Sequence, residues 1–280
     1  MDKLAGDRKP QEYEALLKAQ SDFFTNISHE LKTPLSIILI QIELMKLYRD
    51  DPAKIEELIA VTEQNAYRLT RLAGNMLDLG RIESGFAQVC LVNADIVALV
   101  HSLYDSVKTF TEAKSICLEF HSNVTCRVMP VDMDKMERIV LNLLSNAIKH
   151  TWEGGHIRIS LDVQSTHILL SVTDTGEGIP ADKLEIIFDR FAQVDTSLTR
   201  KNGGAGIGLS LIKSFVGHLG GRIWVASEHG KGSTFYVELP VLPVEAQMIC
   251  DEVEGMGIGK KVELEFSDII FSASPWTCSA

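Results

Sequence analysis

Apolar side chains recur every three or four residues through most of the first fifty positions, with a single step of seven across Gln20. This spacing places them on one face of a long helix, which we predict over residues 11–48. The positions are Leu17, Phe24, Ile27, Leu31, Leu35, Ile38, Ile42 and Met45. A stripe of this length needs a packing partner, because exposed apolar surface is unfavourable in water.

A second apolar stripe begins after a short turn at residues 49–52. Asp51 is suited to cap the second helix, Pro52 to begin it and Gly85 to end it. The stripe consists of Ile55, Leu58, Leu69, Leu72, Met76 and Leu79. Two such helices cannot bury both stripes alone, so we expect an antiparallel helical hairpin that dimerises into a four-helix bundle. The alternative is a hairpin that packs against a second domain of the same chain.

His29 lies off this apolar face. At about 100° per residue it is roughly 200° around the helix from Ile27, so its ring points away from the stripe. Glu30 follows directly, and Thr33 lies one turn further on nearly the same face. Pro34 removes the backbone donor that the Glu30 carbonyl would otherwise bond, which weakens the helix just after the histidine. A single helical histidine is ordinarily a surface or capping residue, so its meaning depends on the rest of the chain.

Composition narrows the classes of function. The 280 residues suit two globular domains, and the net charge of −11 argues against a nucleic-acid-binding surface. No apolar run reaches the roughly eighteen residues of a membrane span, and the acidic N-terminus does not resemble a signal peptide. The five cysteines show no paired short spacing of the zinc or redox kind. We therefore expect reduced thiols and a cytoplasmic location.

Residues 86–241 alternate between strand-like and helix-like patterns. Strands are expected from residue 91, at 116–120, 156–163 and 167–173, and in a hairpin over 222–239 that turns at 230–232. Helices are expected at 96–114, 132–150, 184–191 and 207–219. The hairpins make the sheet mixed, which predicts an α/β sandwich with helices on one face.

The helix over 132–150 carries polar side chains beside its apolar face. Asn142 and Asn146 are four residues apart and therefore share a side of the helix. Their amide oxygens are hard ligands of the kind that Mg²⁺ accepts, and Lys149 is close enough to meet a phosphate. A helix with two solvated asparagines and a lysine is the alternative interpretation.

Two glycine-rich segments follow this helix. Asp174 ends a buried strand and begins Asp-Thr-Gly-Glu-Gly-Ile-Pro, where a carboxylate can accept the adenine amino group and glycines let the backbone approach a flat ring. Residues 203–209 open a helix whose backbone amides favour phosphate. Alone, the first segment is equally consistent with a tight turn. The second lacks the Gly-Lys-Ser/Thr ending of a P-loop.

Together these motifs resemble a known family. Ser28-His29-Glu30-Leu31-Lys32-Thr33-Pro34 is similar to the phosphoacceptor box of bacterial sensor histidine kinases, and residues 11–240 resemble that family's catalytic core. The asparagine helix, the 174–180 segment, Phe188 with Phe191, and the 203–209 run resemble, in order, the N, G1, F and G2 boxes of the histidine-kinase ATPase domain. The resemblance implies a multidomain α and α/β protein: a dimeric helical hairpin followed by an α/β sandwich ATP-binding domain of the gyrase and histidine kinase type.

The resemblance also implies Mg²⁺ and ATP bound beneath a lid at about 190–203. By that match Asn146 is the principal Mg²⁺ ligand, Asn142 assists it and Asp174 reads adenine. Gln193 stands where many relatives carry arginine, so Arg200 or Lys201 would meet the phosphate charge instead. The full set expected to bind nucleotide is Asn142, Asn146, Lys149, His150, Asp174, Gly176, Gly178, Ile179, Arg200, Lys201, Gly204, Gly206, Gly208 and Leu209.

The implied activity is ATP-dependent autophosphorylation of His29, followed by transfer to an aspartate of a response regulator receiver domain. Glu30 would accept a hydrogen bond from the second ring nitrogen and stabilise the forming cation. Thr33 would orient a water on the aspartyl phosphate, as a regulator phosphatase requires. The main alternative is a scaffold that binds ATP, transfers nothing and regulates a partner kinase by heterodimerisation. A chaperone-like or topoisomerase-like ATPase is disfavoured by the histidine hairpin.

The expected boundaries are a lead-in at 1–14, the hairpin at 15–85, the ATP-binding domain at 86–241 and an acidic tail at 242–280. Kinases of this family usually carry a sensor before the histidine domain, yet fewer than thirty residues precede His29. We therefore expect either a fragment or an input from another protein. Within the tail, residues 261–266 alternate as an edge strand would, and the tail is assigned no function.

Overall fold

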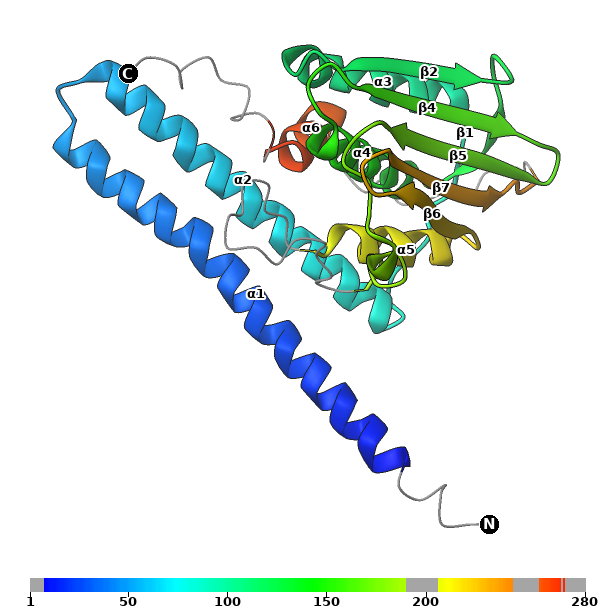
Figure 1. The fold of residues 1–280 in the computed structure, drawn as a ribbon, viewed down its shortest axis with the longest axis horizontal. Coiled ribbons are helices and arrows are strands. Elements are labelled where there is room, and N and C mark those ends of the chain that lie inside the picture. Colours follow the sequence, from blue (N-terminus) through cyan, green and yellow to red (C-terminus); the bar gives the residue numbers. More distant parts are fainter. Residues whose placement is uncertain (1–7, 190–205, 244–256, 268, 270–280) are drawn as a thin grey trace. The chain divides into compact units, whose positions relative to one another are not determined.

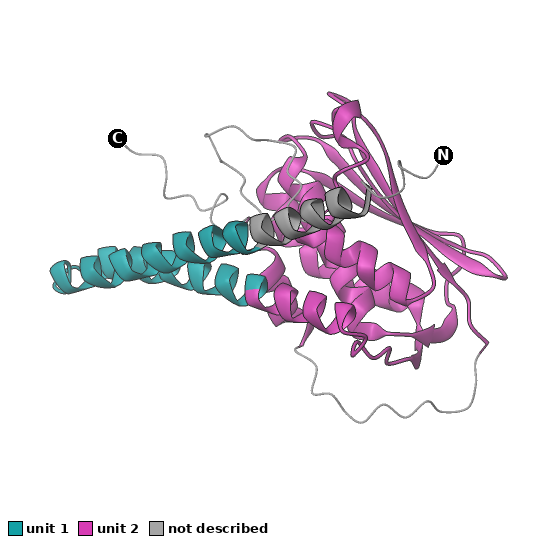
Figure 2. Ribbon diagram, turned by 90° about the horizontal axis from the view of Figure 1, so that it is seen from below, with its two compact units in different colours: residues 1–72 teal, residues 73–280 magenta. Residues whose placement is uncertain are grey.

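The computed structural model describes residues 8–189, 206–243, 257–267 and 269, with side chains from residue 24 onward (Figure 1). The chain divides into two compact units, Met1–Leu72 and Ala73–Ala280, which Figure 2 colours separately. Helix α2 contributes its first part to unit 1 and residues 73–83 to unit 2.

Unit 1 is the expected helical hairpin, formed by α1 (Arg8–Leu47) and the first part of α2 (Pro52–Glu83). Asp51 caps α2, since its Oδ1 accepts a hydrogen bond from the Lys54 amide at 3.1 Å. Gly85 has a φ of +73° and allows the left-handed turn that ends α2. Helix α1 continues through Pro34 despite the missing donor.

Helix α1 presents two neighbouring apolar faces. The first contains the buried residues Ile27 and Pro34. The second, about 90° away at about 100° per residue, is exposed and consists of Phe24, Leu35, Leu39 and Ile42. The exposed fractions of these four side chains run from 39% to 58%, which leaves a continuous apolar stripe in contact with water in a single chain.

Unit 2 is built on a five-stranded sheet with the order β2-β4-β5-β7-β6. Only β2 and β4 run parallel, so the sheet is mixed, as expected. The strands are β2 (Cys117–Ser122), β4 (His156–Val163), β5 (His167–Asp174), β6 (Arg222–Glu228) and β7 (Gly232–Pro240). A separate ribbon pairs β1 (Val92–Asp95) with β3 (Val128–Val131) in antiparallel fashion.

Three helices cover one face of this sheet: α3 (Ile96–Ala113), α4 (Met133–His150) and α5 (Gly208–His218) (Figure 2). Helix α4 lies between the other two and contacts both of them as well as β5. Its inward side chains and those of β4 and β5 are almost fully buried: Ile139, Leu143, Leu144, Ile148, Ile157, Ile159, Leu161, Leu170 and Val172. This α/β sandwich confirms the predicted fold class.

Two local predictions were wrong, and one strand was not predicted. The helix expected at 184–191 is not formed over its described residues, 184–189: a 3₁₀ turn at Ala181–Lys183 leads into hydrogen-bonded turns up to residue 189, and residues 190 and 191 lie outside the described residues. Strand β3 was not foreseen, because Pro130 in a four-residue segment does not suggest a strand. The edge strand expected at 261–266 is helix α6 (Ile258–Glu265), which buries Val262 and Phe266, four residues apart on one helical side.

The cysteines and the helices were both considered when the chain's environment was predicted. Cys117 and Cys126 are free thiols, but Cys90 is disulfide-bonded, so the expectation of fully reduced cysteines was wrong. Among the residues that the structure describes, no helix combines the length and apolar character needed to cross a bilayer.

Lys114 anchors the end of α4. Its Nζ donates hydrogen bonds to the backbone carbonyls of Ile148 at 2.7 Å and Thr151 at 3.3 Å, which lack helical donors. Lys114→Met is expected to lower the stability of unit 2 by about 1 kcal/mol. Leaving the two carbonyls without a donor costs more free energy than is gained by removing a partly buried charge. The melting temperature should fall by about 2–4 °C. Lys213→Met, at an exposed position of α5, is the control, and equal melting temperatures for both variants would contradict this role.

Candidate functional site

His29 lies on the exposed surface of α1, whereas Ile27 is only 4% exposed. The expected outward position of the imidazole is therefore confirmed. Thr33, which directly precedes Pro34, donates its hydroxyl to the His29 carbonyl, one turn earlier in the helix, at 3.1 Å. Glu30 is half-buried beside the histidine. All of these residues belong to unit 1, whereas the residues expected to bind nucleotide belong to unit 2.

The two asparagines of α4 form a connected pair. Asn146 Nδ2 donates to Asn142 Oδ1 at 3.2 Å, and both side chains are half-buried. Gly208 lies against the same pair, since a Cβ at that position would come within 2.6 Å of Asn142 Nδ2. Glycine at the first position of α5 therefore lets this helix begin in close contact with the Asn142 side chain. The structure thus brings together Asn142, Asn146 and Gly208, as the motifs suggested.

The end of α4 meets the glycine-rich turn after β5. The His150 carbonyl accepts a hydrogen bond from the Glu177 amide at 3.2 Å, and His150 Nδ1 pairs with Glu177 Oε1. That side-chain hydrogen bond lowers the pKa of Glu177. Gly176 fits closely here, because a Cβ would come within 2.2 Å of the His150 carbonyl oxygen. His150 therefore fixes the turn to the asparagine helix, a role that its motif position alone did not reveal.

Asp174 is buried at the end of β5, with 6% of its surface exposed. Burial raises the pKa of its carboxyl, while the backbone amides of Gly176 and Ser233 act in the opposite direction. Oδ1 accepts from the Gly176 amide at 2.9 Å. A rigidly held, buried acceptor of this kind can discriminate a purine that carries an amino group from one that lacks it, because the second would leave the acceptor unpaired.

The remaining predicted nucleotide residues divide between described and undescribed segments. Gly178 has a φ of +68°, and the Ile179 amide donates to Ser227 Oγ at 2.8 Å. Gly206 has a φ of +64° and precedes α5, where Leu209 lies in the first turn. Lys149 is half-buried on α4. Arg200, Lys201 and Gly204, with the whole of the expected lid at about 190–203, lie outside the described residues.

These residues fit a nucleotide with Mg²⁺. Asn142 and Asn146 offer amide oxygens, which suit a hard cation that takes its other ligands from phosphates and water. Gly176, Gly178 and Gly208 each lie where a Cβ would collide with backbone or with the asparagine pair. The donor set and the glycine-lined backbone are therefore compatible with the group that the motifs imply.

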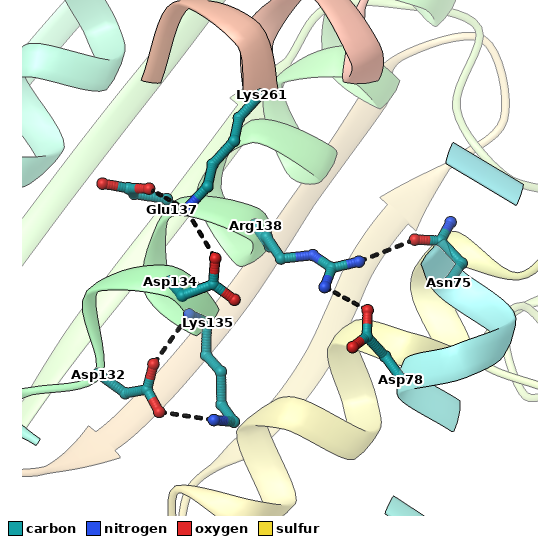
Figure 3. A network of polar contacts seen from close by, with 8 residues as sticks. All are labelled: Asn75, Asp78, Asp132, Asp134, Lys135, Glu137, Arg138 and Lys261. Carbon is teal, nitrogen blue, oxygen red and sulfur yellow. Dashed lines mark hydrogen bonds and ion pairs between the residues drawn. The ribbon is translucent and has the colours of Figure 1, made fainter. Parts of the chain in front are cut away.

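Sequence reasoning missed a polar network around the start of α4 (Figure 3). Arg138 donates to Asp78 and, at 3.0 Å, to Asn75, both on the part of α2 that belongs to unit 2. Asp132 caps α4 through the Lys135 amide at 3.1 Å and also pairs with the Lys135 side chain. The side chains come from segments about sixty residues apart, so no local pattern indicated the pairing.

An apolar cavity lies elsewhere in unit 2. Its lining comes from the segment before β1, from β3 and from the end of β7, and includes Val89, Met129, Ile168, Leu219 and Leu239. None of the asparagine, aspartate or glycine positions of the proposed nucleotide site lines it. The cavity is therefore not part of that site.

Two family matches agree with this geometry. Residues 19–85 match the His Kinase A (phospho-acceptor) domain, and residues 131–243 match the histidine kinase-, DNA gyrase B- and HSP90-like ATPase. The first match contains His29 and the second contains Asn142, Asn146 and Asp174. The exposed histidine and the asparagine helix thus fall in separate matched domains.

Individual relatives extend over both domains. The sensor histidine kinase WalK of Bacillus subtilis is 35% identical over 82% of this chain and 38% of its own length. The crystal structure of full-length ShkA in complex with AMPPNP has a TM-score of 0.61 at 25% identity, over 81% of this chain and 47% of ShkA. Histidine kinase ThkA in complex with the response regulator TrrA has a TM-score of 0.58 at 23% identity, over 86% of this chain and 68% of ThkA, a likeness of fold.

The chain spans only 15% to 39% of the length of the first curated relatives that it matches. Even so, the matched segments include most of the helical hairpin and four of the five strands of the sheet, β4 to β7. The chain therefore belongs to the histidine kinase family, with a phospho-acceptor domain followed by an ATPase domain.

Proposed function

We propose that this protein is an ATP-dependent histidine kinase that phosphorylates its own His29. The carrying observation is an exposed imidazole in a phospho-acceptor hairpin, within the same chain as an ATPase domain that holds a paired-asparagine helix and a buried aspartate. Neither part alone supports a kinase, since the first has no nucleotide site and the second no acceptor.

The chemistry follows from the side chains. A ring nitrogen of His29 attacks the γ-phosphorus of ATP, the bond to the bridging oxygen breaks, and ADP leaves. The Glu30 carboxylate accepts a hydrogen bond from the other ring nitrogen and stabilises the cation that forms. Asp174 holds the adenine amino group, while Lys149 and the start of α5 face phosphate charge. Mg²⁺, when bound at Asn146 and Asn142, offsets the negative charge of the phosphates.

Labelling tests this proposal directly. Incubation of the full chain with γ-³²P-ATP and Mg²⁺ is expected to give a protein label that is stable in base and lost in acid, whereas α-³²P-ATP should give none. A chain that binds ATP yet gains no label from the γ-phosphate would be the scaffold described as the alternative, and the kinase proposal would fail.

We further propose that the phosphoryl group passes to an aspartate of a response regulator receiver domain. The likeness in fold to ThkA, whose structure contains the response regulator TrrA, supports a response regulator as partner, and the hairpin that carries His29 is the docking site we propose for it. Thr33 would position a water for hydrolysis of the aspartyl phosphate, giving a phosphatase activity. A separate or preceding sensor and a cytoplasmic location, where ATP is supplied, stay predictions, as do the proposed domain boundaries.

The working form is proposed to be a homodimer. The exposed stripe of Phe24, Leu35, Leu39 and Ile42 lies beside the buried face of α1, and each helix of a four-helix bundle needs two such faces. A second copy of the hairpin would cover the stripe on both chains at once.

Leu39→Asp is expected to dissociate this dimer. A carboxylate placed between helices loses its water without gaining a partner, which should raise the dissociation constant by at least about 100-fold. Sedimentation velocity across a concentration series measures the change. Ser36→Asp, which is exposed and off the stripe, is the control. An unchanged dimer in the Leu39 variant would place the interface elsewhere.

A further inference from the structure

Helix α6 is a packed part of the ATPase unit, although it lies beyond the matched segment that ends at residue 243. It contacts both α3 and α4. Phe266 directly after it is fully buried and stacks on Phe110 of α3, with ring centroids 4.8 Å apart. Val262 and Ile269 are also buried, with 6% and 3% exposed. Burial of this extent fixes the helix against its neighbours.

Lys261 sets the orientation of α6 on α4. Its Nζ pairs with Asp134 and Glu137, each at 2.6 Å, and its side chain is only 12% exposed (Figure 3). Both carboxylates lie on the first half of α4. With Phe266 held on α3 and Lys261 held on α4, the last turn of α6 is directed at the middle of α4.

That last turn reaches the asparagine pair. Glu265 Oε1 accepts a hydrogen bond from Asn142 Nδ2 at 2.9 Å, and the Glu265 carbonyl accepts one from Ser145 Oγ at 3.3 Å. A carboxylate accepts but does not donate, so the Asn142 amide must direct its nitrogen at Glu265. Asn142 Oδ1 is then directed away, where it accepts from Asn146 Nδ2 at 3.2 Å.

The chain of contacts therefore orients three side chains in sequence. Glu265 fixes the Asn142 amide, Asn142 Oδ1 engages the nitrogen of Asn146, and the Asn146 oxygen is left on the opposite side of its amide group. Groups that orient metal ligands in this way influence metal affinity, and removing one typically weakens it by about 10- to 100-fold.

We propose that Glu265 is a positioning residue of the nucleotide site: it acts through Asn142 to present the Asn146 oxygen to Mg²⁺. The proposal rests on the function proposed above, because it assigns Mg²⁺ to Asn146. It gives α6, which lies outside the matched segment, a role in the ATPase site.

Two opposed substitutions separate the hydrogen bond from the charge. Glu265→Gln keeps the side-chain length and an acceptor oxygen but removes the charge. Glu265→Asp keeps the charge, but its side chain is one methylene shorter, which moves the carboxylate away from Asn142. The full chain is titrated calorimetrically with the non-hydrolysable analogue AMPPNP, once in Mg²⁺ and once in EDTA. Glu263→Ala, at an exposed position of the same helix, is the control.

In Mg²⁺ the Asp variant is expected to bind AMPPNP about five- to tenfold more weakly than the wild type, which is the loss of one hydrogen bond. The Gln and Glu263 variants should remain within about twofold of the wild type on the same scale. In EDTA all four proteins should bind AMPPNP with the same affinity, because the orientation of a metal ligand has no effect when the metal is absent. Thermal unfolding, followed by circular dichroism, verifies that each variant is folded.

Three results would overturn the proposal. Equal binding by the Asp variant and the wild type in Mg²⁺ would show that Glu265 positions nothing. Tighter binding by either variant would show that the carboxylate obstructs the site. A Gln variant as weak as the Asp variant would show that the charge itself, and not the orientation of Asn142, matters. Absence of AMPPNP binding by the wild type would instead refute the proposed function.

Discussion

His29→Gln is expected to abolish the acid-labile label from γ-³²P-ATP while leaving AMPPNP affinity within about twofold of the wild type. Glutamine is similar in length and keeps α1 helical, but its amide nitrogen has no lone pair available for attack on phosphorus. Since His29 is exposed and Thr33 bonds only its backbone carbonyl, the substitution should leave the hairpin folded. Loss of labelling with retained binding separates the acceptor from the nucleotide site.

The control is His101→Gln, which replaces an exposed histidine of α3 in unit 2. It should label at the wild-type rate. Label that persists in the His29 variant, or that disappears in the His101 variant, would assign the acceptor to another residue. Analysis of the labelled peptide after proteolysis at alkaline pH, where a phosphohistidine survives, identifies the position directly.

The elements that could be predicted from the sequence are those with strong local periodicity. Helix α4 has apolar residues on one side, β5 alternates buried and half-buried positions along its eight residues, and β4 alternates over most of its length. Each pattern follows from the repeat of its own backbone, so the fold class could be derived before any contact was known.

Helix α6 shows why other elements could not. Val262, Leu264 and Phe266 alternate as a strand would, and the helical pair Val262 and Phe266 becomes recognisable only once α3 and α4 provide a surface for it. In eight residues the two periods are difficult to distinguish, and tertiary packing decides between them.

The site divides in the same way. Asn142, Asn146 and Asp174 stand in motifs of a few residues, and the motifs suggested the roles proposed for them. The hydrogen bond from Asn142 to Glu265 could not be predicted in this way, because Glu265 lies 123 residues further along the chain. His150 was assigned to nucleotide by its motif, but its ring pairs with Glu177 and its carbonyl with the Glu177 amide. Contacts of this kind depend on how α4 meets the turn after β5.

Asn146→Ala is expected to have the second large effect. The substitution removes the oxygen proposed as the main Mg²⁺ ligand, so AMPPNP affinity in Mg²⁺ should fall by about 10- to 100-fold, and labelling of His29 should fall by at least as much. In EDTA the variant should bind as the wild type does, because Asp174 and the glycine-rich turn remain. The methyl group of alanine is compatible with α4, so the fold should be retained.

Calorimetric titration with AMPPNP measures the affinity in Mg²⁺ and in EDTA. Gln164→Ala is the control, since it removes an exposed amide from the turn between β4 and β5. Equal weakening in the two buffers would mean that Asn146 contacts the nucleotide and not the metal. Unchanged affinity in both would mean that the asparagine pair is not part of the nucleotide site, and the assignment of Glu265 as its positioning residue would then fail with it. Because Asn142 lies between Glu265 and Asn146, the Glu265→Asp and Asn146→Ala effects in Mg²⁺ should also be less than additive when combined, as expected of residues that act through one chain of contacts.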